Sequence, residues 1–450
     1  MLEPEKTLDN LQKKSILPTM LGVFDVKLMT SYIAELKKHP KRKSFLLVFR
    51  YLLRAQISVL KLVKACVTYQ HKWKGVLLQE KNAITQIVQL LSIAYEDDPD
   101  TAVLCESLWN EIFTLLSFML QIGGKSVLEA LSPIMIKNWH IITGRCVSIL
   151  QEKKLMESKL WRMTLTFIAV TLTTEGQRIA MATEEKEHCI AHILDARIPT
   201  EGDNSVCSGV SLCQSLIKLY DTVALRPNVQ SFVMKQAVAN SLKAVLELSE
   251  TAKASAMEDG FVESLCEQLK SLHVKLTMEI LDGPHLLIQQ QNGKKEGHHL
   301  INQVILTLDL LRNFLYNNTE VKIAAYETGL SNLIHKLWAW GQVDSALMMA
   351  LVTLLATYTA KCPQGCTSLA FTSSQMTIDK TITSVPQTSN SSLVHCIIKL
   401  VQKESSEMSS SGNPDLLKVT FNVLMTLSLS QECRGIMWKS NFLQDFSKLS

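Results

Sequence analysis

The chain has 450 residues, 47% of them hydrophobic, with only 17 glycines and 11 prolines. This composition excludes a disordered or low-complexity chain and favours packed helices. Its 46 basic and 42 acidic residues nearly balance, whereas nucleic-acid binders concentrate positive charge, so no nucleic-acid partner is expected. Most of the eleven cysteines lie in apolar helical stripes and are interpreted as small hydrophobic residues of a reduced, cytosolic or nuclear compartment.

The N-terminal residues 1–20 mix charged and apolar side chains and lack the apolar core of a signal peptide. We therefore expect a loosely ordered segment over 1–20 and one helical repeat array over 21–450. Residues 28–36 begin a helix that must end before Pro40.

A basic run occupies residues 37–43 and has two interpretations. It could be a nuclear signal or a patch for an acidic partner. It could also be a solvated turn between helices, which is favoured because an apolar helix resumes at Phe45.

Acidic residues over 96–100 predict a turn that caps a helix beginning at Thr101. Trp109, Trp139 and Trp161 fall within helical stripes beyond this turn and are predicted to lie in the core.

Small and polar residues, with several helix breakers, predict four looped-out inserts at 199–210, 283–299, 371–392 and 405–413. The longest uncharged apolar run, 345–360, is shorter than the ~20 residues that span a bilayer. We interpret it as a buried helix and expect no membrane insertion.

The clearest repeat unit is the stretch 303–340. Apolar residues recur every three or four positions up to Leu315, the spacing of a long amphipathic helix. Thr319 is predicted to cap a short helix over 320–327, and Gly329 then suits a left-handed helix end before a third helix. Long helix, short helix, glycine and medium helix is the order of an armadillo unit, which needs neighbours to bury its faces.

Weaker copies of this unit recur along the chain. Leu246 and Leu427 take the position of Leu315 in two of them and are predicted to be buried with it. The expected fold is all-α, an irregular armadillo- or HEAT-like right-handed superhelical solenoid with looped-out inserts. The equivalents of Lys322 in the other copies are Lys74, Lys125, Arg178, Lys253, Gly365 and Arg434.

Two short motifs resemble binding sites but have structural interpretations. Residues 123–126 (GGKS) end like a phosphate-binding loop but lack its first glycine, and they coincide with a turn of one copy. Cys362 and Cys366 are spaced like a metal pair without a second pair at zinc-module distance.

The histidines give no stronger signal. His188 and His192 stand one helical turn apart and could hold a metal, although surface histidines at this spacing are common. His298 and His299 lie in an insert without a nearby carboxylate or thiolate. We assign no catalytic, cofactor-binding or metal residue and expect no enzyme activity and no cofactor.

Residues 311–315 (LRNFL) resemble the end of an armadillo third helix, where family members carry an asparagine that lines the concave groove. Asn313 matches it. Nuclear-import adaptors of this fold repeat that asparagine, with a tryptophan one turn earlier, to clamp an extended peptide; here the residue one turn earlier is Asp309. The missing ladder argues against that activity. The other copies carry Ala65, Ser117 or its neighbours, Ala169, Ala244 and Met425 at the equivalent position.

The chain also resembles the carboxy-terminal part of the rotatin family, very large armadillo-like proteins of centrosomes and ciliary basal bodies, as in the stretch 37–75. The resemblance implies a cytoskeletal, non-catalytic scaffold that binds centriole-assembly proteins. Its expected processes are centriole assembly and elongation, cilium formation and left-right axis determination. It implies no small-molecule substrate. The alternative is a peptide-binding adaptor or a regulatory subunit of a cytosolic or nuclear complex.

Overall fold

The computed structural model describes residues 16–39, 43–69, 72–181, 189–197, 206–224, 229–279, 299–371, 392–407 and 412–440. Almost all of these residues are helical. Within this described part the only β pairing is an isolated bridge between Arg197 and Cys207. The chain divides into two compact units, Met1–Ser255 and Ala256–Ser450, which are described separately.

The first unit is built on a column of long helices, because α4 packs on α7, α7 on α9 and α9 on α12. A second set of helices lies beside this column, with α8 packed on α11. Phe113 and Phe167 join α7 to α9, with ring centroids 5.0 Å apart. The elements of this unit are α2 (Ile16–Leu21), α3 (Val26–Lys38), α4 (Lys43–Tyr69), α5 (Lys72–Gln79), α6 (Lys81–Gln89), η1 (Leu90–Ser92), α7 (Pro99–Lys137), α8 (Trp139–Gln151), η2 (Lys153–Leu155), α9 (Lys159–Ala180), α10 (Ile190–Asp195), α11 (Ser208–Ala224), α12 (Val229–Leu248) and the start of α13 (Glu250–Glu258).

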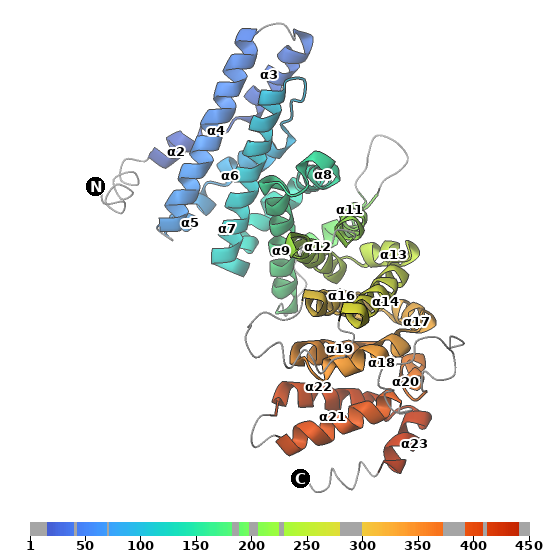
Figure 1. The fold of residues 1–450 in the computed structure, drawn as a ribbon. Helices are drawn as coiled ribbons and strands as arrows, with labels where there is room; N and C mark the ends of the chain where they lie inside the picture. Colours follow the sequence, from blue (N-terminus) through green and yellow to red (C-terminus); the bar gives the residue numbers. More distant parts are fainter. Residues whose placement is uncertain are drawn as a thin grey trace. The chain divides into compact units, whose positions relative to one another are not determined.

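The second unit repeats the order long, short and medium helix. The long helices α16, α19 and α22 stack on one another, and the short helices α17, α20 and α23 form a parallel stack (Figure 1). The armadillo-like helical repeat predicted from 303–340 is therefore confirmed. The bounds are α14 (Phe261–Glu279), α16 (His299–Leu315), α17 (Thr319–Glu327), α18 (Leu330–Gly341), α19 (Ser345–Thr359), α20 (Pro363–Ser368), α21 (Leu393–Glu407), α22 (Pro414–Leu427) and α23 (Gln431–Lys439).

Each short helix of this unit begins with a side-chain cap. Asn318, Cys362 and Ser430 accept hydrogen bonds from the amides three residues later. The cap of α17 is thus Asn318, one residue before the predicted Thr319. Counting from the caps also makes Cys366, and not Gly365, the structural equivalent of Lys322.

Gly260 and Gly329 follow the short helices α13 and α17 and adopt positive φ angles of 72° and 78°. This is the left-handed conformation expected where a helix ends and the chain turns into the next one. The glycine prediction at 329 is confirmed, and the same device serves the preceding copy.

The predicted core residues are buried. Leu246, Leu315 and Leu427 have no measurable exposure. Trp109, Trp139 and Trp161 are also buried, as is most of α19, the run predicted to be an inner helix.

Several sequence predictions need correction in the first unit. The acidic turn over 96–100 caps its helix as predicted, because Asp98 accepts from the Thr101 amide at 2.9 Å, but the helix begins at Pro99, two residues before Thr101. Lys125 lies inside α7, just beyond a kink at Gly124. Arg178 lies in the last turn of α9. A second helical segment of α7 begins at Lys125 after the non-helical Gly124, whereas Arg178 continues a long helix, so the copy proposed at Arg178 lacks the three-helix order.

The predicted inserts and the segment 1–20 fall mostly outside the described residues. At their edges, α2 begins at Ile16, α11 at Ser208 and α16 at His299, and α21 continues to Glu407. These parts of the ranges are helical and do not belong to loops.

One described helix, α7, is long and apolar enough to cross a membrane. Most of its apolar stretch is buried within the protein. The uncharged run 345–360 forms the buried helix α19, as predicted.

Candidate interaction surface

The long helices α16, α19 and α22 present equivalent positions side by side on their stack. Asn313, Thr357 and Met425 each lie five residues before the cap of the following short helix. Asn313 and Thr357 are half-buried, and Met425 is 70% exposed. The column of residues is chemically mixed, so it lacks the repeated amide that holds a peptide backbone in register.

Asn313 itself is poorly placed to bind a peptide. Its Oδ1 atom is buried and has no hydrogen-bond partner. The neighbouring Asp309 faces Arg312 at 3.9 Å. An unpaired buried acceptor costs about 1–3 kcal/mol. The amide oxygen would have to move before a partner could reach it.

Three strongly exposed apolar side chains lie in the last described repeat. Met425 on α22, Leu429 after it and Trp438 on α23 are each at least 70% exposed. Single exposed hydrophobic residues are ordinary, but three on adjoining elements suit contact with another protein.

Cysteines of the short-helix stack form hydrogen bonds with backbone groups. The Cys362 Sγ atom accepts from the Gly365 amide at 3.4 Å, and the Cys433 thiol donates to the Cys366 carbonyl at 3.2 Å. Burial raises the pKa of the Cys366 thiol to about 11. Metal ligation requires thiolates, so this environment favours structural thiols.

Lys322 lies beside these cysteines. Its Nζ atom donates to the Ala360 carbonyl at 2.5 Å, at the C-terminal end of α19. Burial lowers the pKa of this lysine. Within the described ranges, no three histidine, cysteine, aspartate or glutamate side chains lie close enough together to hold a metal ion.

A small cavity in the first unit lies beside Arg145. The Arg145 guanidinium stacks on Trp109, 3.8 Å from the ring centroid, and its Nε donates to the Leu91 carbonyl at 2.7 Å. Glu106 and Glu152 also line the cavity, and burial raises the pKa of Glu106. The volume is about 40 Å³, which suits a few water molecules, whereas small-molecule sites need roughly 300 Å³ or more.

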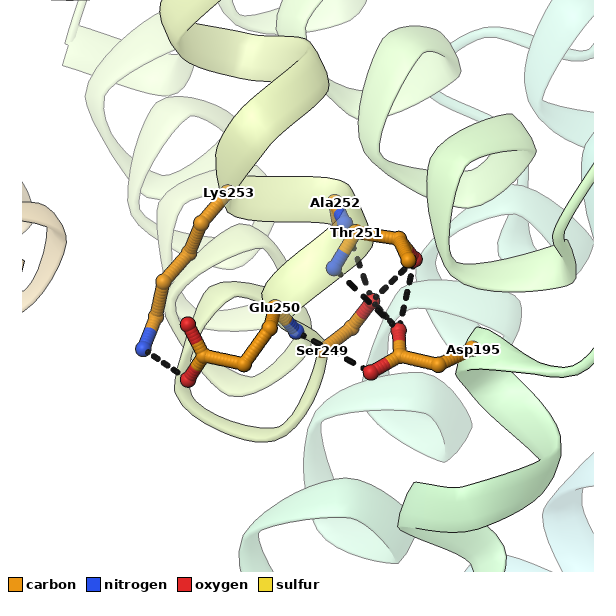
Figure 2. A network of polar contacts seen from close by, with 6 residues as sticks. All are labelled: Asp195, Ser249, Glu250, Thr251, Ala252 and Lys253. Atoms are coloured by element: carbon orange, nitrogen blue, oxygen red, sulfur yellow. Dashed lines mark hydrogen bonds and ion pairs between the residues drawn. The ribbon is translucent and has the colours of Figure 1, made fainter.

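A polar network joins α10 to the start of α13 (Figure 2). Asp195 accepts hydrogen bonds from the hydroxyls of Ser249 and Thr251, and from the Glu250 amide at 3.2 Å. Lys253 pairs with Glu250 at 2.9 Å on the other side of the turn. The carboxylate from α10 therefore caps a helix that lies more than fifty residues further along the chain.

A buried ion pair in α9 is a feature that the sequence did not indicate. Glu175 and Arg178 pair at 2.7 Å inside α9, and the Ile190 amide donates to the same carboxylate at 2.6 Å. Burial opposes ionisation of Glu175, but the hydrogen bonds from Arg178, Cys189 and Ile190 outweigh it and lower its pKa. A glutamate three residues before an arginine is common on helices, so only burial distinguishes this pair.

The remaining motifs have structural roles or fall outside the described residues. The GGKS stretch forms the kink of α7, and Lys125 contacts the sulfur of Met181. His192 lies on α10, and its proposed partner His188 is outside the described residues, as is His298.

No protein-family model matches the chain. Mouse rotatin is 28% identical to it over 461 aligned residues, which cover 99% of this chain and 20% of the relative. The chain is similar to rotatin throughout its length. Human rotatin is 25% identical over 460 residues, which cover all of this chain and 20% of the length of human rotatin. The chain thus spans about a fifth of the length of the rotatins that it matches.

Solved structures also align with the chain. A designed armadillo repeat protein covers 76% of it at a TM-score of 0.42 and 12% identity, with 99% of the designed chain aligned. The crystal structure of Uso1-2 covers 96% of it at a TM-score of 0.43 and 11% identity, with 63% of that chain aligned.

Proposed function

We propose that this chain is a non-catalytic, armadillo-like scaffold that binds other proteins at the centrosome and the basal body of the cilium. The observation that carries the proposal is the similarity to rotatin along the entire chain, from α2 to α23. Stacked repeats provide long surfaces on which several partners can dock without a catalytic group.

The proposed processes are centriole assembly and elongation, cilium formation and left-right axis determination, and the proposed partners are centriole-assembly proteins. The proposed location is the cytoskeleton of the cytoplasm. No small-molecule substrate, nucleic acid or membrane insertion is part of the proposal. The surface ending in Met425, Leu429 and Trp438 is the proposed contact region.

A peptide-clamping adaptor is the alternative. It is less well supported because Asn313 is followed by Thr357 and Met425 at the equivalent positions, and its own amide oxygen is buried.

The proposal is tested by expressing the full chain with a fluorescent tag and imaging it with a centriole marker. We expect coincident foci, and shortened or missing centrioles after depletion that the wild-type chain rescues. The variant Met425→Glu with Leu429→Glu should fold normally and rescue poorly, whereas Val274→Glu, at an exposed position of α14, should rescue. Diffuse staining and normal centrioles after depletion would refute the centrosomal role.

A further inference from the structure

The outer face of α4 carries a second strip of exposed apolar side chains. Leu47, Tyr51, Leu62 and Tyr69 are between 43% and 65% exposed. They lie opposite the buried residues of the helix, such as Leu53, through which α4 contributes to the core.

The strip has the spacing of a helix-packing seam. Residues 47, 51, 54, 58, 62, 65 and 69 follow one another at steps of three and four. Such steps keep side chains on one line along a helix and allow them to interdigitate with a partner helix. From Leu47 to Tyr69 the seam is roughly 33 Å long at ~1.5 Å per residue. We define this set of residues as the α4 seam.

Charge identifies what could cover the α4 seam. Helix α4 contains five basic residues and no acidic one. Arg50 pairs with Asp98 at 2.6 Å, but no carboxylate among the described residues pairs with Arg54, within the seam, or with Lys61 beside it. The mainly apolar seam therefore carries positive charge at Arg54, whose guanidinium lies 5.9 Å from the Tyr51 ring centroid, and beside it at Lys61.

We propose that the α4 seam docks an acidic amphipathic helix of another protein, laid along α4 with its apolar side chains on Tyr51 and Leu62 and its carboxylates against Arg54 and Lys61. A helix lying in an apolar surface is a recurrent mode of recognition. Charge complementarity sets its specificity and speeds its association.

Two other occupants fit less well. A second copy of the chain would place Arg54 and Lys61 against the same residues, and like charges repel. A lipid surface would draw Arg54 and Ser58, at the middle of the seam, toward the acyl boundary. A partner helix avoids both costs by placing a carboxylate or a small residue opposite them. The inference does not depend on the centrosomal location proposed above.

The test uses the full chain and two synthetic helical peptides of about four heptads. Both peptides carry leucine at the positions that would face the α4 seam. At the positions on either side of these leucines, one peptide has glutamate and the other has lysine. Fluorescence anisotropy should show binding of the glutamate peptide, weakened by salt, and none of the lysine peptide. Tyr51→Ala and Leu62→Ala should each weaken binding about tenfold. Val274→Ala, at an exposed valine of α14, is the matched control and should have no effect.

Charge reversal gives the decisive arm. The double variant Arg54→Glu with Lys61→Glu should lower the affinity for the glutamate peptide at least tenfold. The same variant should bind the lysine peptide, which the wild type does not. Both residues are exposed, so the thermal unfolding midpoint should not change. Equal affinity for both peptides would overturn the proposal. So would unchanged selectivity in the reversed variant, dimerisation that the reversal abolishes, or stronger binding to vesicles of phosphatidylcholine and phosphatidylserine in equal amounts.

Discussion

The Arg178 guanidinium donates hydrogen bonds to both carboxylate oxygens of Glu175, from Nε at 2.7 Å and from Nη2 at 2.8 Å, at the buried end of α9. The same carboxylate holds the Ile190 amide at the start of α10. One glutamate therefore connects two consecutive helices of the first unit, and both contacts favour its ionised form.

Removing one partner of this pair should be costly. Arg178→Ala leaves the Glu175 carboxylate buried without its cation, so we expect the free energy of unfolding to fall by about 3–5 kcal/mol. Chemical denaturation measures it. Arg162→Ala, at an exposed position of the same helix, is the control and should change stability by less than ~0.5 kcal/mol. Equal effects of the two substitutions would show that the buried pair is dispensable.

The pair also predicts a dependence on pH. The pKa of Glu175 is lower in the folded chain than its ordinary value of 4.5. Its contribution is therefore present above pH 4.5 and is lost as the pH falls through the folded pKa. Glu175→Gln should flatten the loss of stability below pH 4.5, measured as the thermal midpoint against pH. Parallel curves for the variant and the wild type would contradict the assignment.

Leu315 should control the stability of its own repeat. Leu315→Ala removes fully buried methyl groups and should cost about 2–5 kcal/mol. Hydrogen exchange should show lost protection in α16, α17 and α19, while α5 in the first unit keeps its protection. Tyr316→Ala, at an exposed neighbour, should leave exchange unchanged. Uniform loss of protection along the chain would argue against a repeat array.

Asp195 should be needed to hold the start of α13. Asp195→Ala removes the acceptor shared by Ser249, Glu250 and Thr251, and should cost about 1–3 kcal/mol. Faster exchange of the α13 amides is the expected signature, with Asp195→Asn intermediate. Glu258→Ala, exposed on the same helix, should leave these amides as they are.

Cys362 should act through its cap and not through a metal. Cys362→Ser preserves an N-cap acceptor and should leave stability nearly unchanged, whereas Cys362→Val should cost about 1 kcal/mol. Elemental analysis of the purified chain is expected to show no stoichiometric zinc. Zinc at one equivalent, lost in Cys362→Ser, would replace the capping role with a metal site.

The second unit could be predicted closely from sequence because its local signals agree. The spacing up to Leu315, the glycine at 329 and the apolar run of α19 each indicate one element, and each element has the predicted type. The cap at Asn318 was missed because asparagine and threonine are adjacent there and both are good caps.

The first unit was harder because several of its determinants are not local. Arg178 matches the repeat pattern in sequence, but it continues a long helix. Nothing near Glu175 or Asp195 in the sequence indicates that each holds a later segment. The α4 seam could not be predicted from sequence because both faces of this helix carry apolar residues. Only their exposure in the structure separates the seam from the core face.

The Lys322 contact links one repeat to the next through a side chain. Its ammonium reaches the Ala360 carbonyl at the end of the next long helix, whereas the equivalent Arg434 donates to Ser428 and Leu429 within its own turn. Between α20 and α23 the comparable link is the weaker thiol bond of Cys433. The two junctions are therefore bridged by different chemistry: a lysine side chain bonded to a helix-terminal carbonyl at one, and a buried thiol at the other.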